Sequence, residues 1–599
     1  MNRNTNTQHN SILTMLLFSA AAHQASAADP CASGANPCVL DGAALAPYTG
    51  SSLVVDAPSA TVVLAADLSA SSVSIVANSV VLHENARLDL SGSLDITAEE
   101  LSIAGYAAAQ RIVVAAGNAT FVGNGTLDAS GRGEAQVSGD GRGVSTPPNN
   151  YNSNGDVRST ALTTYSRYRG GSGASHGGMG GHGDPTENAQ TRNPYGDLET
   201  PTLPGSGGGK GVVTILWQTE QSHRHGWWWS GWWYTYSYPK TWRTYDRAGG
   251  AGGGSINVTV VNSLVLNGSS TALLADGLAG QDGIRADTNQ QAFAGGGGGA
   301  GGSVYVSADS FEGSGRVRAA GGAGGSGGYT HLTSTSSSHL QFGGGGGGGG
   351  RIAIHCTTCA SLDGASFGVD GARLLSGVTL SAQGGVAGAS KPGTSAGPLS
   401  GAPGPIYADA ADHRMVLLAN HDGRSVSSAS DAWTRLPTGA GATPLLDRLI
   451  VYMAHARLQA SPSFRRIDAD GSVVAVLEAV HATEVVAIES GTWTLSAALS
   501  TATLSVGAAV EIYTDADATP LELSASSSLS FAGHAAAQRI VVAAGNATFV
   551  GNGTLDAGAN RLGQGLGLAS GSGAQGGTHG GQGGGSTGVP YGDLETPTS

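Results

Sequence analysis

A long internal duplication constrains the fold of this chain more than any other feature of its sequence. The stretch Ala104–Ala129 (AGYAAAQRIVVAAGNATFVGNGTLDA) returns as Ala532–Ala557 with a single substitution. The nonapeptide PYGDLETPT also occurs twice, at Pro194–Thr202 and again at Pro590–Thr598. Self-similarity of this kind is typical of repeat proteins, in which neighbouring units complete one another's core. The sequence therefore predicts a repetitive architecture.

Short segments that alternate apolar and polar residues follow one another closely within a unit. They are Leu53–Val55, Val62–Leu64, Val73–Val76, Val80–Leu82, Leu88–Leu90, Leu94–Ile96, Leu101–Ile103 and Ile112–Val114. Strands this short cannot bury a core singly, but stacked coils can. We therefore expect an all-β fold, a parallel β-helix-like solenoid with glycine-rich layers or loops; the alternative is a tandem β-sandwich array. The solenoid is favoured because many segments recur at less than about ten residues, closer than sandwich strands.

Runs of glycine interrupt this pattern at regular intervals. Glycine accounts for 98 of the 599 residues, and the runs 249–254, 295–302 and 343–350 each lead directly into a strand-like segment. The runs have no strict triplet period, which excludes collagen. They are either flexible linkers or places where backbones pack closely, as in turns or layered polyproline II coils. Their regular alternation with strands favours ordered packing.

The first residues have the pattern of a secretory signal peptide. Arg3 supplies a positive charge, Ile12–Ala22 is an apolar stretch, and Ala25–Ala27 is a cleavage signature. A signal peptide spanning residues 1–27 is therefore expected, with the mature chain beginning at Ala28. No later run reaches the roughly 18 consecutive apolar residues that a membrane helix needs. The predicted location is secreted, extracellular or at the cell surface.

Four cysteines form two local pairs in the sequence. Cys31 and Cys38 follow the expected cleavage site, and Cys356 and Cys359 form a CxxC motif. Disulfides between near neighbours are the default in an oxidising compartment, so we expect Cys31–Cys38 and Cys356–Cys359. A zinc or redox site at the CxxC is the alternative, but only His355 lies close enough in sequence to be a further ligand.

Six asparagines lie in N-x-S/T sequons and are candidate glycosylation sites on the surface. They are Asn118, Asn124, Asn257, Asn267, Asn546 and Asn552.

The segment Trp217–Tyr245 differs in composition from the rest of the chain, because it holds seven of the nine tryptophans. It lies between two glycine runs, so we expect a loop or hairpin that projects from the stack. The rings either bury one another or bind a partner, above all flat sugar rings. Adjacent Trp227–Trp229 cannot all face inward in an extended strand, and a large exposed aromatic patch indicates a partner. The candidate ligand-binding residues are Trp227, Trp228, Trp229, Trp232, Trp233, Tyr234, Tyr236, Tyr238 and Trp242.

Sequence patterns for metals and cofactors are incomplete. His176, Met179, His182 and Asp184 suggest a metal site, but the second unit offers only His579 in the matching stretch. We therefore expect these histidines to be exposed by chance in a glycine-rich loop. No metal site and no cofactor is predicted.

Two aspartate-rich stretches, Asp468–Gly471 and Asp515–Asp517, are fragments of calcium loops that lack the terminal glutamate. Solvated turns are expected there, with an irregular calcium site as the open alternative. Gly205–Lys210 lacks the Ser or Thr that follows the lysine of a phosphate-binding loop. No nucleophile elbow or HExxH motif occurs, so no catalytic residue is predicted.

Four motifs carry a resemblance to a known class of protein. They are Tyr195–Leu198 (YGDL), Pro204–Gly209 (PGSGGG), Ala251–Ile256 (AGGGSI) and the glycine run that ends in Arg351–Ile354 (RIAI). With them the chain resembles the glycine-rich repeat units of very large secreted or surface proteins of bacteria and marine microbes. The resemblance extends from about residue 101 to 355 and restarts at 531. It implies an extracellular β-rich repeat protein of the adhesin or matrix type, and brings no catalytic residues.

These inferences combine into a secreted or cell-surface adhesive or matrix repeat protein that binds polysaccharide or other surface components through its Trp-rich insert. A purely structural wall or matrix component is the first alternative, and a β-helix polysaccharide lyase or hydrolase the second. The formal net charge of −14 argues against a nucleic-acid partner. The expected segments are the signal peptide (1–27), a first β-repeat region (28–130), a glycine-rich loop region (131–211), the Trp/Tyr-rich insert (212–248), a region of glycine runs and strands (249–360), a second β-repeat region (361–530) and the start of a second copy (531–599).

Overall fold

The computed structural model is almost entirely β-structure. It describes residues 29–31, 34–135, 138, 142, 168–183, 193–216, 242–283, 294–327, 343–359, 373–375, 377–390, 398–410, 413–419, 434–436, 446–458, 464–476, 480–495, 498–514, 521–537 and 539–556. Within these ranges the only helices are α2 (Gly42–Leu45) and a single 3-10 turn, Ala46–Tyr48. The expected all-β class is confirmed.

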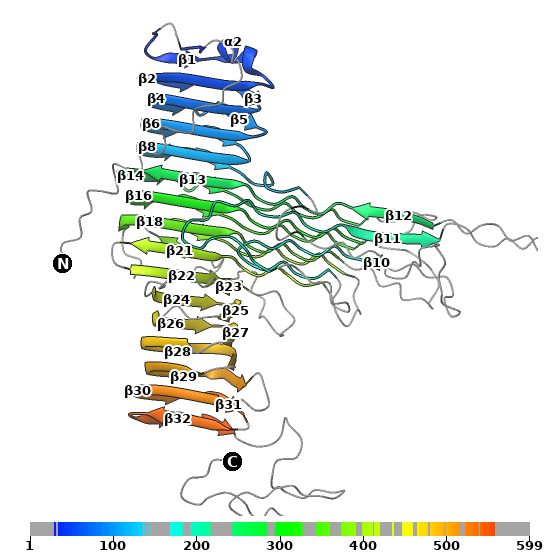
Figure 1. Ribbon diagram of the computed structural model, residues 1–599, viewed down its shortest axis with the longest axis vertical. Coiled ribbons are helices and arrows are strands. Elements are labelled where there is room, and N and C mark those ends of the chain that lie inside the picture. The colour runs from blue at the N-terminus through cyan, green and yellow to red at the C-terminus, as the bar shows by residue number, and fades with distance from the viewer. Residues whose placement is uncertain are drawn as a thin grey trace, which may run out of the picture.

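Two sheets, parallel except for the antiparallel pair β19–β20, form the N-terminal half of the fold, which we call the first stack (Figure 1). The larger sheet contains β1 (Cys38–Leu40), β2 (Ser52–Leu64), β4 (Ser72–Leu82), β6 (Ser93–Ile103), β8 (Arg111–Val122), β13 (Ser255–Val260), β14 (Ser263–Asn267), β16 (Ser303–Gly313), β18 (Arg351–Cys359) and β21 (Pro405–Ala410). The smaller sheet contains β3 (Leu68–Ala70), β5 (Arg87–Leu90), β7 (Tyr106–Ala108), β9 (Thr126–Asp128), β15 (Ala272–Leu274), β17 (Arg316–Arg318), β20 (Val378–Ser381) and β19 (Arg373–Leu375). The chain alternates between the two sheets as it advances through the stack.

The strands of the larger sheet are longer than the sequence pattern predicts. In β4, Val73, Ile75 and Ala77 face the core, then Asn78 and Ser79 both lie away from it, and burial resumes at Val80. Since neither of the two polar residues is Gly or Pro, the extended backbone continues through them. Only the alternation changes, because the positions that face the core are displaced by one residue after Ser79. Pairs of predicted short strands are therefore joined into one bent strand, and β6 repeats this pattern.

An unbroken column of aliphatic side chains runs through the first stack. Strand pairing places the following residues directly above one another, each at most 4% exposed: Leu53, Val73, Leu94, Ile112, Ile256, Val304, Ile352 and Ile406. The step from Ile112 to Ile256 skips a long stretch of sequence without a gap in the column. We call the strands that one turn of the chain contributes to the stack a rung. Long insertions thus leave the stack between two rungs, and the chain then returns to the same register.

These insertions meet in a bundle of glycine-rich segments that projects sideways from the first stack (Figure 1). The segment 294–302, which is buried throughout, shows how the bundle is built. Its N–H groups donate in a strict rotation to residues 275–281, 206–209 and 345–348, with N···O distances of 2.6–3.0 Å. Its carbonyls accept from residues 171–174, 250–253 and 322–325. One segment therefore bonds to six neighbours, each contacted at every third residue, which is the period of a polyproline II helix.

The close approach of these segments requires glycine. A Cβ atom at Gly297 would fall on the Ser172 carbonyl, and one at Gly299 on the Ala251 carbonyl. A polyproline II segment has no internal hydrogen bonds, so its buried N–H and C=O groups need partners on adjacent segments. The expectation of ordered packing is confirmed for the described glycine runs. The lattice joins segments from both sides of residues 212–248 into one body.

A second stack continues from the first through an antiparallel pair. β21 pairs in antiparallel fashion with β22 (His413–Ala419), after which parallel pairing resumes. Because the chain direction reverses there, the two cores lie on opposite faces of the shared sheet. Ile406 packs in the first core while Tyr407 and Val416 pack in the second. The junction strands are therefore buried on both faces, and each has buried apolar residues at consecutive positions, 406–407 in β21 and 415–418 in β22.

The strands of the second stack can be followed in Figure 1 from β22 to β32. They are β23 (Thr434–Leu436), β24 (Leu446–Tyr452), β25 (His455–Leu458), β26 (Phe464–Asp470), β27 (Ser472–Val476), β28 (Val480–Leu495), β29 (Leu499–Thr514), β30 (Leu521–Phe531), β31 (His534–Ala536), β32 (Ile540–Ala544), β33 (Ala547–Phe549) and β34 (Thr554–Asp556).

Candidate functional site

The Trp-rich insert begins and ends on a β-hairpin at the far end of the bundle. Strand β11 (Gly211–Leu216) pairs in antiparallel fashion with β12 (Trp242–Arg247), and β10 (Tyr168–Arg169) adds a third strand. Figure 1 shows this small sheet at the end of the bundle remote from the two stacks. Leu216 and Trp242 are direct Cα partners, so both ends of the insert lie side by side.

Of the predicted ligand-binding residues, only Trp242 belongs to the described part of the chain, where it begins β12. The others, Trp227, Trp228, Trp229, Trp232, Trp233, Tyr234, Tyr236 and Tyr238, lie outside the described residues. Their grouping therefore stays a prediction. What the structure supplies is the place from which the insert leaves the bundle.

His176 is a buried part of the glycine lattice, which corrects the expectation that it is exposed by chance. Its side chain is inaccessible to solvent, and its Nδ1 lies 2.8 Å from the Gly301 carbonyl. Gly171 and Ala174 donate their N–H groups to the carbonyls of residues 295 and 298, so the next acceptor in this series is residue 301. At the place where its segment turns back, the ring N–H of His176 donates to this carbonyl of Gly301 in place of a backbone N–H. Burial and the nearby Arg351 guanidinium lower the pKa of His176 to about 3, so the ring is neutral.

The first copy of the repeated nonapeptide, which we call the strap (194–202), crosses the base of the bundle. The ring of Tyr195 lies against that of His176, with centroids 4.7 Å apart, and its hydroxyl donates to the Pro204 carbonyl at 2.6 Å. Gly196 has φ +92°, where a side chain would be strained and would also press on Arg351. Leu198 packs against the second core. The strap therefore ties the bundle to the sheets.

Arg351 is the buried cation that holds the strap. Its Nε–H donates to the Tyr195 carbonyl at 2.8 Å, and the residue is 2% exposed. Burial lowers the pKa of Arg351 to about 10. Because this value is still well above 7, the guanidinium remains charged at neutral pH. Asp197 lies on the strap near this charge. Burial alone would raise the pKa of Asp197, but hydrogen bonds from Thr200 and Glu199, with the Arg351 charge, lower it.

A second polar cluster lies under the strap around His355. Its Nε2 donates to the Glu199 carbonyl at 2.7 Å, and its ring lies between those of Tyr305 and Tyr407, with centroids 5.3 and 5.4 Å away. Asp409 lies 3.7 Å from Nδ1. Burial alone would lower the pKa of His355, but the Asp409 carboxylate together with the Glu199 backbone and charge raises it. A His–Asp pair can move protons in principle. Here Nε2 bonds to the backbone of the strap at Glu199, so the pair fastens the strap.

Sequence reasoning missed both clusters. The repeated PYGDLETPT was recognised as a repeat, and the RIAI motif only as part of a resemblance. A signal was present, because Arg351 and His355 are polar residues in an otherwise apolar strand that follows a glycine run.

The burial of His176 predicts an acid-sensitive bundle. The pKa of a free histidine is about 6.5, so below that pH the unfolded chain takes up a proton that the folded ring rejects down to pH 3. Stability is therefore full above pH 6.5 and falls on acidification, by about 1 kcal/mol between pH 6 and pH 5 from this group. Hydrogen exchange of residues 170–183 at several pH values measures the loss. His176→Gln should make the stability of the bundle less dependent on pH. An unchanged slope of stability against pH in this variant would contradict the prediction.

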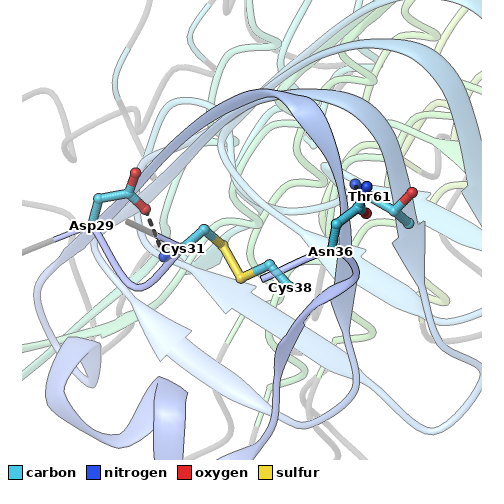
Figure 2. The surroundings of a disulfide bond; sticks show 5 residues. All are labelled: Asp29, Cys31, Asn36, Cys38 and Thr61. Atoms are coloured by element: carbon cyan, nitrogen blue, oxygen red, sulfur yellow. Dashed lines mark hydrogen bonds between the residues drawn. A yellow bond between two sulfur atoms is a disulfide. The ribbon is translucent and has the colours of Figure 1, made fainter. Parts of the chain in front are cut away.

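The two cysteine pairs lie at disulfide distance, as the local pairing predicts. The Cα atoms are 5.7 Å apart for Cys31–Cys38 and 5.8 Å apart for Cys356–Cys359, within the normal range. Figure 2 shows the first bridge at the N-terminal end of the stack, where the Asp29 carboxylate accepts from the Cys31 N–H at 2.9 Å. Asn36, between the two cysteines, accepts from the Thr61 N–H and so ties the bridged loop to β2.

None of the six sequon asparagines is buried, and their glycosylation stays a prediction. Asn124, Asn267, Asn546 and Asn552 are exposed, and Asn118 and Asn257 are partly exposed.

The aspartate-rich stretch 468–471 ends β26 and turns into β27. The Asp468 carboxylate accepts from Arg448 at 2.7 Å and from Arg466 at 2.8 Å, so two guanidinium groups neutralise it. Asp515–Asp517 lie outside the described residues. In the part of the chain that the structure describes, no three His, Cys, Asp or Glu side chains group together as metal ligands would.

A shallow hollow of about 360 Å³ lies beside the smaller sheet near its N-terminal end, and Thr49, Ser69, Ser71 and Ser91 are among its lining residues. Its two charged side chains, Asp89 and Arg132, are paired with each other, and Arg132 also donates to the Leu90 carbonyl.

Among the described helices, none is long and apolar enough to cross a membrane. No protein-family model, no curated protein and no solved structure matches this chain, so its own residues carry the functional argument.

Proposed function

We propose that this chain is an extracellular adhesive or matrix repeat protein that binds polysaccharide through its Trp-rich insert. The observation that carries the proposal is the place of the insert. Its two ends are paired at β11–β12, and an internally hydrogen-bonded bundle holds this hairpin away from the stacks (Figure 1). A rigid spacer that ends in an aromatic-rich insert suits a protein that presents a binding surface to a distant partner.

The proposed architecture is a β-helix-like solenoid. The chain passes from β4 to β5 and then to β6 and β7, visiting the two sheets of the first stack in the same order on each turn. Strands pair in parallel from turn to turn, which supports coils that advance along one axis. Such a scaffold tolerates long insertions between rungs, because each rung contacts only its neighbours.

The chemistry of the insert supports a saccharide ligand. Tryptophan and tyrosine combine large apolar faces with a polar edge, so they can cover the faces of sugar rings while donating to hydroxyls. The signal-like N-terminus and the two cysteine pairs support secretion. The proposed role is binding without catalysis, with cell-surface or matrix polysaccharides as partners.

The test replaces residues 217–241 by a two-residue Asn-Gly turn. Because Leu216 and Trp242 are direct partners, such a turn can join β11 to β12 without disturbing the hairpin. Both proteins are assayed against a panel of soluble and insoluble polysaccharides. We expect binding by the natural chain and at least a tenfold loss, about 1.4 kcal/mol or more, in the variant. A matched variant with 329–342 replaced by Gly/Ser should bind normally.

Equal binding by all three proteins, or binding by none, would overturn the assignment of the insert. The second outcome would favour a purely structural wall or matrix component, and blue-shifted, quencher-resistant tryptophan emission would indicate that the rings pack against one another. Release of reducing ends or unsaturated sugars from the panel would instead indicate a lyase or hydrolase.

A further inference from the structure

One sequence occurs in two different environments in this protein. The first copy of the duplicated stretch forms β7, β8 and β9, and the second forms β31–β34 at equivalent positions. On one side, β8 pairs with β6 and β32–β33 with the corresponding strand β30. On the other side, β8 is covered by β13 and β14, and β9 by β15. Within the described residues, nothing pairs with the corresponding side of β32–β34.

The uncovered rung leaves core positions exposed. Phe121 is 0% exposed in the first copy, whereas its counterpart Phe549 is 51% exposed. The inward residues of β8 are buried, but those of β32 and β33 are partly or fully exposed. The same side chains are a finished core in one place and an unpartnered apolar edge in the other. Such an edge is a template for strand addition.

We propose that the open side of β32–β34 is a docking surface for a parallel β-rung of another repeat unit, of the type formed by residues 255–274. The first copy specifies what this partner must supply. Its covering rung presents Ile256, Val258 and Val260 in β13, then Leu264 and Leu266 in β14, all at most 3% exposed. The register is fixed as well, since Ile256 pairs with Ile112 and Leu266 with Phe121. In the second copy the incoming strand would therefore place its equivalents over Ile540 and Phe549.

The opposite end of the first stack is built differently. There α2 and the turn after it lie over the first rung, with Leu45 and Tyr48 buried, and the Cys31–Cys38 bridge secures the segment (Figure 2). This inference is independent of the proposed polysaccharide binding, because it involves no residue of the insert.

The test uses a fluorescent synthetic peptide of residues 253–275 and the full chain. We expect saturable binding, and no binding of a scrambled peptide that lacks the apolar alternation. Phe549→Asp should weaken binding at least about tenfold, because it places a carboxylate in the new core. Val550 is the matched control. It is adjacent and 48% exposed, but its counterpart Val122 lies outside the core, so Val550→Asp should stay within about twofold.

Register gives a second readout. Val265 pairs with Thr120, so a peptide carrying Val265→Cys should form a disulfide with Thr548→Cys in the chain and not with Ser530→Cys, one rung back. Equal binding by Phe549→Asp and the natural chain would overturn the proposal. So would binding that appears only after residues 557–599 are removed, because the occupant would then be this chain's own C-terminal segment.

Discussion

Replacing Phe121 by alanine is expected to lower the free energy of unfolding of the first stack by about 3–5 kcal/mol, the usual cost of deleting a buried phenylalanine. The same replacement at Phe549 should change stability by less than about 0.5 kcal/mol, as surface substitutions do. Both residues lie in the sequence GNATFVGNGTLDA, so local propensity is matched. They differ in burial, 0% against 51% exposed.

The measurement is hydrogen exchange of β6 and β8 for the first variant and of β30 and β33 for the second. A local probe is needed because a chain of 599 residues is not expected to unfold in one step. Phe121→Leu serves as control, since it keeps most of the buried volume and should cost less than Phe121→Ala. Similar losses at both sites would contradict the difference in burial and would mean that the second copy is covered as well.

These two phenylalanines also show how far sequence reasoning can reach here. The alternation of apolar residues located the strands, although it made them too short, because alternation depends on the local sequence alone. It could not distinguish a covered rung from an open one, because that depends on β13–β15, which lie far from Phe121 in the chain. Burial in a stack is decided by the next rung, wherever in the sequence that rung comes from.

The glycine runs were predictable in kind but not in partners. Their alternation with strands indicated ordered packing, yet nothing in the sequence says that Gly297 bonds to Gly209 and accepts from Gly250. His176 was interpreted wrongly for the same reason. A histidine among glycines suggests exposure when only its own segment is considered. Its place at the end of a hydrogen-bond series becomes visible only when the neighbouring segments are assembled around it.

The sequence indicates even less clearly the contacts of the strap and the point between the stacks where the core changes from one face of the sheet to the other. Arg351 and His355 are recognisable as polar residues in an apolar strand, but their partners Tyr195 and Glu199 come from a segment more than one hundred residues earlier. The reversal depends on one antiparallel pair, β21–β22. Adjacent apolar residues in both strands are compatible with burial on two faces, but they do not give the direction of the chain.

Replacing Gly297 by alanine is expected to destabilise the bundle by about 3 kcal/mol, the upper part of the range for overpacking a well-packed core. The added methyl would fall on the carbonyls of Gly171 and Ser172, which belong to a neighbouring segment held by its own hydrogen bonds. Relief requires the two segments to separate, and separation breaks hydrogen bonds that no water replaces in the buried interior. The loss should appear as faster hydrogen exchange throughout 294–302.

Gly42→Ala is the matched control for this change. A Cβ at Gly42 would lie in ordinary contact, 3.9 Å from the Ala66 Cβ, and Gly42 is the first residue of α2, capped by Asp41. Alanine there should be neutral or stabilising by up to about 1 kcal/mol, because it restricts the unfolded chain and favours the helix. If Gly297→Ala were equally harmless, the runs would behave as linkers. A large loss of stability at Gly297 alone would show that the bundle requires residues without side chains. The protein can then hold its Trp-rich insert far from the stacks with almost no apolar core in between.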